Sequence, residues 1–144
     1  MKNVIVFLDF DGVFHPYFSE NKFEDLPLFE SIIREYSDKI NFKMVISSSW
    51  KKRKTLDEIK AIFSNDIASQ IVSIAPTLED SDGSRLKEAQ LWLEANNNEQ
   101  CDWIALDDDH YAWGKHENLV WCLDKFKDHE SALLNSKLNV ILAT

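Results

Sequence analysis

Residues 3–8 form an apolar, largely β-branched run that leads directly into Asp9-Phe10-Asp11-Gly12-Val13. A run of this kind predicts a buried strand of a parallel sheet. Asp9 and Asp11 follow the carboxyl end of this strand, which is where ligands bind in open α/β sheets. This stretch therefore indicates both an α/β fold and the position of its site.

The rest of the sequence alternates between short apolar runs and segments with helical spacing. Further strands are expected over 42–46, 70–75, 103–106 and 119–123, and helices over 27–36, 56–63, 84–95 and 131–138. This alternation predicts a doubly wound, mainly parallel, Rossmann-like sheet of about five strands with helices on both faces. We expect one domain over 1–144, with a short flap at about 12–25.

Several polar residues mark the expected helix ends. Asp25 and Ser84 are predicted N-caps, and Thr55 with Glu58 is predicted to form a capping box. A polar turn region is expected over 76–83, and a separate apolar run over 140–142 follows the last helix.

The formal charge of the chain is −9, and its cations cluster only at Lys51-Lys52-Arg53-Lys54. Attraction to nucleic acid or to an anionic membrane depends on clustered Lys and Arg, so we expect no membrane partner and no extended nucleic-acid surface. The four cations fit either a solvated helix entrance or a group that steers a phosphorylated substrate. No signal-like segment and no run of roughly 20 apolar residues occur, which predicts a soluble, cytoplasmic protein.

Polar side chains follow two later strands as well. Ser47 comes directly after the second strand, and Asp107-Asp108 come after the fourth. Because the carboxyl ends of parallel strands share one edge of the sheet, these residues should converge with Asp9 and Asp11. Carboxylates crowded in this way repel one another unless a cation is present, and hard oxygen ligands suit Mg²⁺.

Each of these motifs alone has a structural interpretation. Acids after a strand often cap turns, a lone serine often hydrogen-bonds a strand end, and an acidic triplet is often a solvated loop. The combination is far more specific: acid-x-acid-Gly, then a hydroxyl, then a basic residue at a helix start, then paired acids. The basic residue is Arg85 or Lys87.

In this order and spacing, the chain resembles a capless phosphohydrolase of the haloacid dehalogenase (HAD) superfamily. More narrowly, it is similar to the HAD domain of Swiss Army Knife RNA repair proteins. The narrower resemblance rests on Ile46-Ser47-Ser48-Ser49-Trp50, on 85–93 and on Leu106-Asp107-Asp108-Asp109. One departure is Leu86, because a glycine often follows the basic residue in such sequences.

The resemblance implies that Asp9 attacks phosphorus to form an aspartyl-phosphate. Asp11 would protonate the leaving oxygen and then accept a proton from the hydrolytic water. Mg²⁺ would be held by Asp9, the main-chain carbonyl of Asp11, and Asp107, with Asp108 acting through a metal-bound water.

The resemblance also implies groups that bind the phosphate. Ser47 would hydrogen-bond a phosphoryl oxygen, and a cation at the helix start would balance developing charge. The narrower family favours Arg85 for this cation. The superfamily more often has lysine here, which favours Lys87. The structural alternative is that Arg85 is an ordinary surface residue of the helix. Ser48 and Gly12 are expected beside the substrate.

Within the superfamily, an acid at Asp11 favours a phosphatase or a phosphotransferase over a dehalogenase or a transporting ATPase, and hydrolysis is the simpler of the two reactions. The segments 12–42 and 50–84 are too short to hold a cap domain. A capless site implies an open crevice and a large substrate, such as a protein or a nucleic-acid end. The acidic composition argues mildly against long nucleic acid. The expected partner is a phosphorylated substrate whose identity the sequence leaves open, and a phosphorylated nucleic-acid terminus and a small phosphate ester are both candidates.

Two other functions use the same residues. The chain could be a non-catalytic module that binds phosphate and metal for regulation, although intact Asp9 and Asp11 argue against this. It could also be a metal-dependent nuclease, which would cut a chain rather than release inorganic phosphate.

The remaining candidates are aromatic and sulfur side chains. His15, His110, His116 and His129 are expected at the surface, with His15 and His110 as candidates for the pocket wall. The tryptophans are expected in the core, except that Trp113 could form a stacking wall with Tyr17. Cys101 and Cys122 lack metal or disulfide spacing and are expected in the core.

Overall fold

The computed structural model describes residues 1–78 and 84–144 of the chain. The strands are β1 (Lys2–Leu8), β2 (Ile40–Ile46), β3 (Ile71–Ile74), β4 (Asp102–Asp107) and β5 (Leu119–Trp121). The helices are α1 (Leu26–Tyr36), α2 (Leu56–Lys60), α3 (Asn65–Ala68), α4 (Ser84–Ala95) and α5 (Asp128–Leu142), with a 3₁₀ turn, η1, at Ser49–Lys52. Most of the expected turn region over 76–83 lies outside the described residues.

The strands form one five-stranded sheet in the order β3-β2-β1-β4-β5, and every pairing is parallel. The predicted α/β fold is therefore confirmed. Leu8, the last residue of β1, pairs with Ile46 of β2 and with Leu106 of β4. The residues that follow Leu8, Ile46 and Leu106 consequently stand level at one edge of the sheet.

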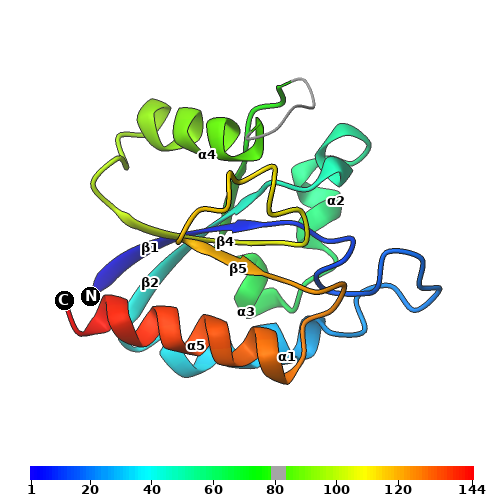
Figure 1. Ribbon diagram of the computed structural model, residues 1–144, viewed down its shortest axis with the longest axis horizontal. Coiled ribbons are helices and arrows are strands. Elements are labelled where there is room, and N and C mark those ends of the chain that lie inside the picture. Colours follow the sequence, from blue (N-terminus) through cyan, green and yellow to red (C-terminus); the bar gives the residue numbers. More distant parts are fainter. Residues whose placement is uncertain (79–83) are drawn as a thin grey trace.

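Helices cover both faces of the sheet, as Figure 1 shows, with α4 on one side and α1 and α5 on the other. Alternate residues of β1 explain this arrangement. Val4 and Val6 pack into the larger core with α1 and α5, while Ile5 and Phe7 pack into the smaller core under α4. Both sides of β1 are apolar because both are buried. No cap domain covers the sheet edge in the described part of the chain.

Several element boundaries differ from the prediction. The expected helix over 56–63 was too long, because α2 ends at Lys60 and a separate α3 follows. Glu30 of α1 accepts hydrogen bonds from the backbone N–H and the hydroxyl of Ser64, which fixes the turn between α2 and α3. The run over 140–142 belongs to α5. Among the described residues, no helix combines the length and the apolar character needed to cross a bilayer.

The capping predictions were right at one position. Thr55 and Glu58 form the expected capping box at the start of α2. Asp25 precedes α1 but makes no side-chain cap; its carboxylate instead accepts from the Phe126 N–H at 3.1 Å and from Lys127 Nζ at 2.8 Å. This acid ties the start of α1 to the segment before α5. Ser84 is the first residue of α4 rather than its cap.

One tryptophan was assigned wrongly to the core: Trp121 is 44% exposed, because β5 is a short edge strand. For Trp113, the alternative of a stacking wall is excluded, since the ring is fully buried and packs against Phe7. Of the two cysteines, Cys122 is buried as predicted and Cys101 is partly exposed.

Candidate active site

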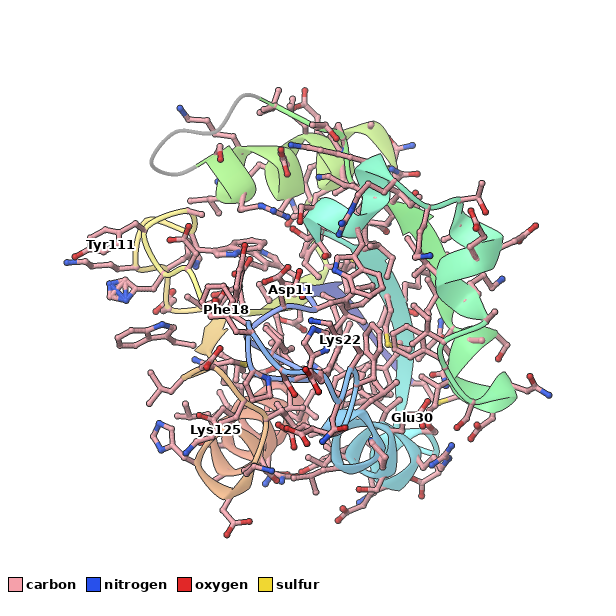
Figure 2. All side chains as sticks on the ribbon, turned by 90° about the vertical axis from the view of Figure 1, so that its right-hand side faces the viewer. Asp11, Phe18, Lys22, Glu30, Tyr111 and Lys125 are labelled. Carbon is pink, nitrogen blue, oxygen red and sulfur yellow. The ribbon has the colours of Figure 1, made fainter. Side chains whose placement is uncertain are left out.

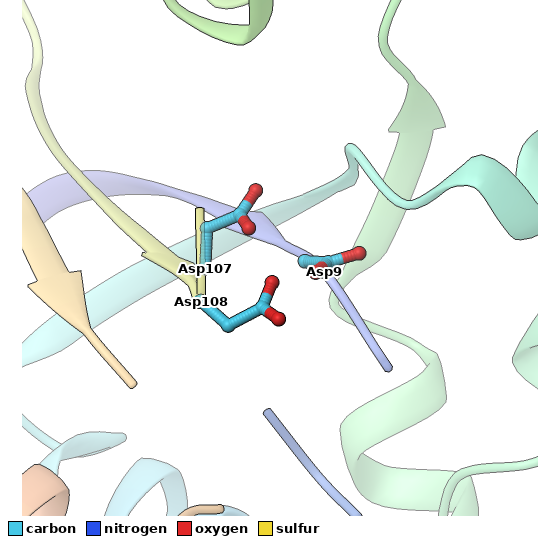
Figure 3. A group of neighbouring side chains, drawn as sticks. All are labelled: Asp9, Asp107 and Asp108. Carbon is cyan, nitrogen blue, oxygen red and sulfur yellow. The ribbon is translucent and has the colours of Figure 1, made fainter. Parts of the chain in front are cut away.

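Three carboxylates gather at the carboxyl edge of the sheet (Figure 3). Asp9, Asp107 and Asp108 each offer an oxygen, and these oxygens lie within 4.8 Å of one another. The sheet places them: the Asp9 N–H donates to the Leu106 carbonyl at 3.1 Å, which sets Asp9 beside the end of β4. The predicted convergence of these acids is confirmed.

Asp107 is held in place by hydrogen bonds to both of its carboxylate oxygens. The Asp109 N–H donates to Oδ1 at 3.0 Å, and the buried indole Nε1 of Trp113 donates to Oδ2 at 2.9 Å. Asp107 is only 2% exposed, so these bonds replace lost water. They fix the direction of the carboxylate and leave its remaining lone pairs toward Asp9 and Asp108.

The cluster is electrostatically crowded. Burial and the neighbouring Asp107 raise the pKa of Asp9 well above its usual value, although Arg85 opposes the shift. Burial and Asp107 also raise the pKa of Asp108, to about 7. The protein alone therefore disfavours three ionised carboxylates here. Carboxylate oxygens are ligands that suit a hard divalent cation such as Mg²⁺, and a cation would offset the repulsion among the three carboxylates. Asp9, Asp107 and Asp108 would hold this ion.

Gly12 is required by the geometry of this cluster. Its φ is +79°, a conformation that favours glycine, and a Cβ at this position would overlap the carboxyl group of Asp108. The Gly12 N–H donates to the His15 carbonyl at 2.9 Å and closes the turn after Asp11. Gly12 thus allows the backbone that follows Asp11 to pass close to the side chain of Asp108.

The side chain of Asp11 lines the same cavity but is not part of the acid cluster, and its carboxylate oxygens have their own hydrogen-bond partners. Its Oδ1 lies 2.8 Å from His15 Nε2, and its Oδ2 accepts from Trp50 Nε1 at 2.9 Å. Burial acts to raise the pKa of Asp11, but these two hydrogen bonds outweigh it and hold the pKa below its usual value. The expectation that its main-chain carbonyl binds Mg²⁺ stays a prediction.

The phosphate-binding candidates are only partly brought together. Arg85 lines the site, and its Nη1 lies 3.5 Å from the buried hydroxyl of Ser47. Lys87 is exposed and does not line the site. Ser48 is buried, and its hydroxyl accepts from the Trp50 N–H as the cap of η1. Geometry therefore favours Arg85 over Lys87 as the phosphate cation.

A cavity of about 560 Å³ opens over the acids. Its lining residues are Asp9, Asp11, Tyr17, Ser49, Lys52, Ser84, Arg85, Asp107, Asp108, Asp109 and Ala112. Sequence reasoning missed Ser49 and Ser84. For the basic cluster at 51–54, the sequence allowed either a solvated helix entrance or a group that steers substrate. In the structure Lys52 lines the cavity, whereas Lys51 Nζ is buried and lies 2.8 Å from Glu88 Oε1.

The histidine at position 15 was also assigned wrongly to the surface, since it is fully buried beneath the site. His110 and His116 are half-buried, and His129 is exposed as expected. The proximity of His15 to Asp11 in the sequence was the available signal, because a residue four positions after the acid can fold back onto it. Trp50, three residues after Ser47, carried no such signal.

Asp108→Asn provides a test of metal binding that needs no substrate. We expect this variant to melt at a temperature equal to or above that of the wild type without metal, because it removes one of three repelling carboxylates. The raised pKa of Asp108 means that the folded wild type loses stability as pH rises from the ordinary carboxyl range through about 7, so the advantage of the variant should grow up to about pH 7 and level off above it. Mg²⁺ should then stabilise the wild type more than the variant.

The matched control is Asp102→Asn, an exposed acid at the opposite end of β4. This variant should respond to Mg²⁺ as the wild type does. Thermal melts that show no Mg²⁺ effect on the wild type would contradict the assignment of a cation site.

Comparison with known proteins supports one family. The sequence profile of the HAD domain in Swiss Army Knife RNA repair proteins matches residues 5–125, which include every acid described above. Searches of curated proteins and of solved structures gave no significant match. Because the matched region spans most of the chain, the protein belongs to the family of HAD domains found in Swiss Army Knife RNA repair proteins.

Proposed function

We propose that this chain is a Mg²⁺-dependent phosphomonoesterase that acts through an aspartyl-phosphate on Asp9. The observation that carries the proposal is that the buried Asp9, the carboxylate cluster to which it belongs and the Arg85 guanidinium share one cavity. Family membership supports the same reaction class.

The proposed reaction has two displacements at phosphorus. Asp9 Oδ attacks, the bond from phosphorus to the leaving oxygen breaks, and Asp11 gives that oxygen a proton. Water then attacks the phosphorus of the acyl phosphate, Asp11 accepts its proton, and the Asp9 carboxylate leaves. Bound Mg²⁺ supplies positive charge that offsets the repulsion between the Asp9 carboxylate and the anionic phosphate.

Phosphate binding is assigned to Arg85, which lines the cavity, and to the buried Ser47 hydroxyl beside it. These two groups are close enough to each other to contact neighbouring phosphoryl oxygens. Lys52 adds a second cation at the cavity wall, so a phosphate that enters meets positive charge as well as the acids.

Exposed aromatic rings beside the cavity support a nucleic-acid end as the substrate. Tyr17 lines the cavity and is 54% exposed, and Phe18 next to it is 93% exposed. Figure 2 shows Phe18 and Tyr111 on the same face as Asp11. Trp121 is joined to the site through its Nε1, which donates to the Asp108 carbonyl at 2.9 Å. Exposed rings of this kind can stack on unpaired bases.

The charge of the chain limits the length of nucleic acid that it would hold. With a formal charge of −9, the protein has little attraction for a long phosphate backbone. The proposed substrate is therefore one or a few terminal nucleotides that carry a phosphomonoester. The matched family, which occurs in RNA repair proteins, supports the same substrate class.

The proposal is tested by a phosphate-release screen with Mg²⁺ over nucleotides, sugar phosphates, phosphopeptides and oligonucleotides phosphorylated at the 3′ or 5′ end. We expect oligonucleotide ends to be preferred. Failure of every ester to release phosphate would contradict an enzyme, and cleavage within the oligonucleotide chain would indicate a nuclease instead.

Tyr17→Ala tests the stacking role separately. Loss of one base–ring contact should raise the KM for a phosphorylated oligonucleotide by about tenfold, with a smaller change for a phosphate ester that has no base. Leu91→Ala, at an exposed position of α4, is the matched control. Equal changes in KM for both substrates would remove the stacking role.

A further inference from the structure

The imidazole of His15 is fully buried, and both of its nitrogens have partners. The Phe23 N–H lies 3.0 Å from Nδ1, and Asp11 Oδ1 lies 2.8 Å from Nε2. A backbone N–H can only donate, so Nδ1 must accept and carries no proton. The ring proton therefore resides on Nε2 and is donated to Asp11.

The backbone at Phe23 is arranged for this contact. Phe23 has a φ of 63°, which is unusual for a side chain other than glycine. Such a conformation persists when its surroundings determine it, and it often accompanies function. The Phe23 ring packs edge-on against His15 at 4.9 Å and against Trp50 at 5.2 Å, which closes an aromatic wall around the imidazole.

Asp11 is consequently held by one donor on each oxygen, and the two donors come from separate segments. His15 lies in the 12–25 segment, whereas Trp50 lies in the η1 turn directly after the β2 motif. Each carboxylate oxygen has two lone pairs, so one lone pair on each remains for a substrate proton. The two donors fix where those lone pairs point.

We infer that His15 is a positioning residue for the acid–base step, holding the Asp11 carboxyl group toward the leaving oxygen through its Nε2–H. This inference rests on the proposed phosphatase function. His15 does not touch the phosphate and takes no proton itself. Asp11 also accepts a proton from water in the second displacement, which is the same for every ester. The contribution of His15 should therefore depend on the leaving group only in the first displacement, which kcat/KM reports.

Two esters with different leaving groups can be compared in the same protein sample, which gives a test that does not depend on comparing preparations. The p-nitrophenolate ion leaves without a proton, whereas an alkoxide from an alkyl phosphate needs one. His15→Phe keeps an aromatic ring but removes both nitrogens, so kcat/KM for an alkyl phosphate should fall by about 10- to 100-fold. The kcat/KM for p-nitrophenyl phosphate should change by less than about threefold. The ratio of the two rates does not depend on how much protein is folded.

Two further variants separate positioning from packing. His15→Gln restores an N–H donor near the position of Nε2 and should recover most of the alkyl phosphatase rate. In an Asp11→Asn background, His15→Phe should cause no further loss, because residues that act through one group are not additive. His129→Gln, at an exposed histidine of α5, is the matched control.

A nitrogen-15 spectrum of the histidine side chains provides a readout that does not depend on turnover. The expected result is a His15 ring with its proton on Nε2, and a shift of that signal in Asp11→Asn. A proton on Nδ1 would overturn the inference, as would an equal loss of kcat/KM for both esters in His15→Phe. Absence of any hydrolysis by the wild type would instead overturn the proposed function, and this inference with it.

Discussion

Asp9→Asn is expected to lower phosphate release by on the order of 10⁴- to 10⁶-fold, because the amide cannot attack phosphorus. The substitution keeps the size of the side chain and removes a charge from a crowded cluster. The fold should therefore persist, and metal-free thermal stability should not fall. Steady-state release of inorganic phosphate with Mg²⁺ is the measurement.

Asp109→Asn is the control for this experiment. Asp109 is exposed at the cavity wall and is not one of the three clustered acids. It should keep most of the activity. If Asp9→Asn released phosphate at the wild-type rate in a clean preparation, Asp9 would not be the nucleophile.

Arg85→Ala is expected to lower kcat by about 10²- to 10³-fold, because the guanidinium is the charged donor next to Ser47 in the cavity. Lys87→Ala should have little effect, since this side chain is exposed and outside the cavity wall. The two substitutions remove the same charge from positions two residues apart on α4. Comparison of their kcat values therefore separates local chemistry from overall charge.

The opposite ranking would contradict the assignment of the phosphate cation. A larger loss in Lys87→Ala would mean that the start of α4 turns when substrate binds and presents the lysine instead. Equal, small losses would leave Lys52 as the main cation of the cavity.

The sequence was sufficient to predict the sheet and its acidic edge. The apolar run over 3–8 and the acids after it follow from burial on both faces of a parallel strand. The level alignment of Asp9, Ser47 and Asp107 then follows from parallel pairing, which needs no knowledge of side-chain contacts. Those residues were therefore predicted before their distances were known.

The partners that orient the acids could not be predicted in the same way. Trp113 donates to Asp107 and Trp50 donates to Asp11, yet both indoles occur in sequence as ordinary apolar residues. A hydrogen bond from a buried ring depends on tertiary packing rather than on periodicity. The same reason explains why Trp121 was wrongly expected in the core.

The covalent intermediate is the central claim, and trapping it is the most direct test. Protein, Mg²⁺ and a phosphorylated oligonucleotide with a radiolabelled terminal phosphate are mixed and quenched in acid within one turnover. We expect label on the peptide that contains Asp9 and none in Asp9→Asn. Release of phosphate with inverted configuration at phosphorus, and no labelled peptide, would contradict the account.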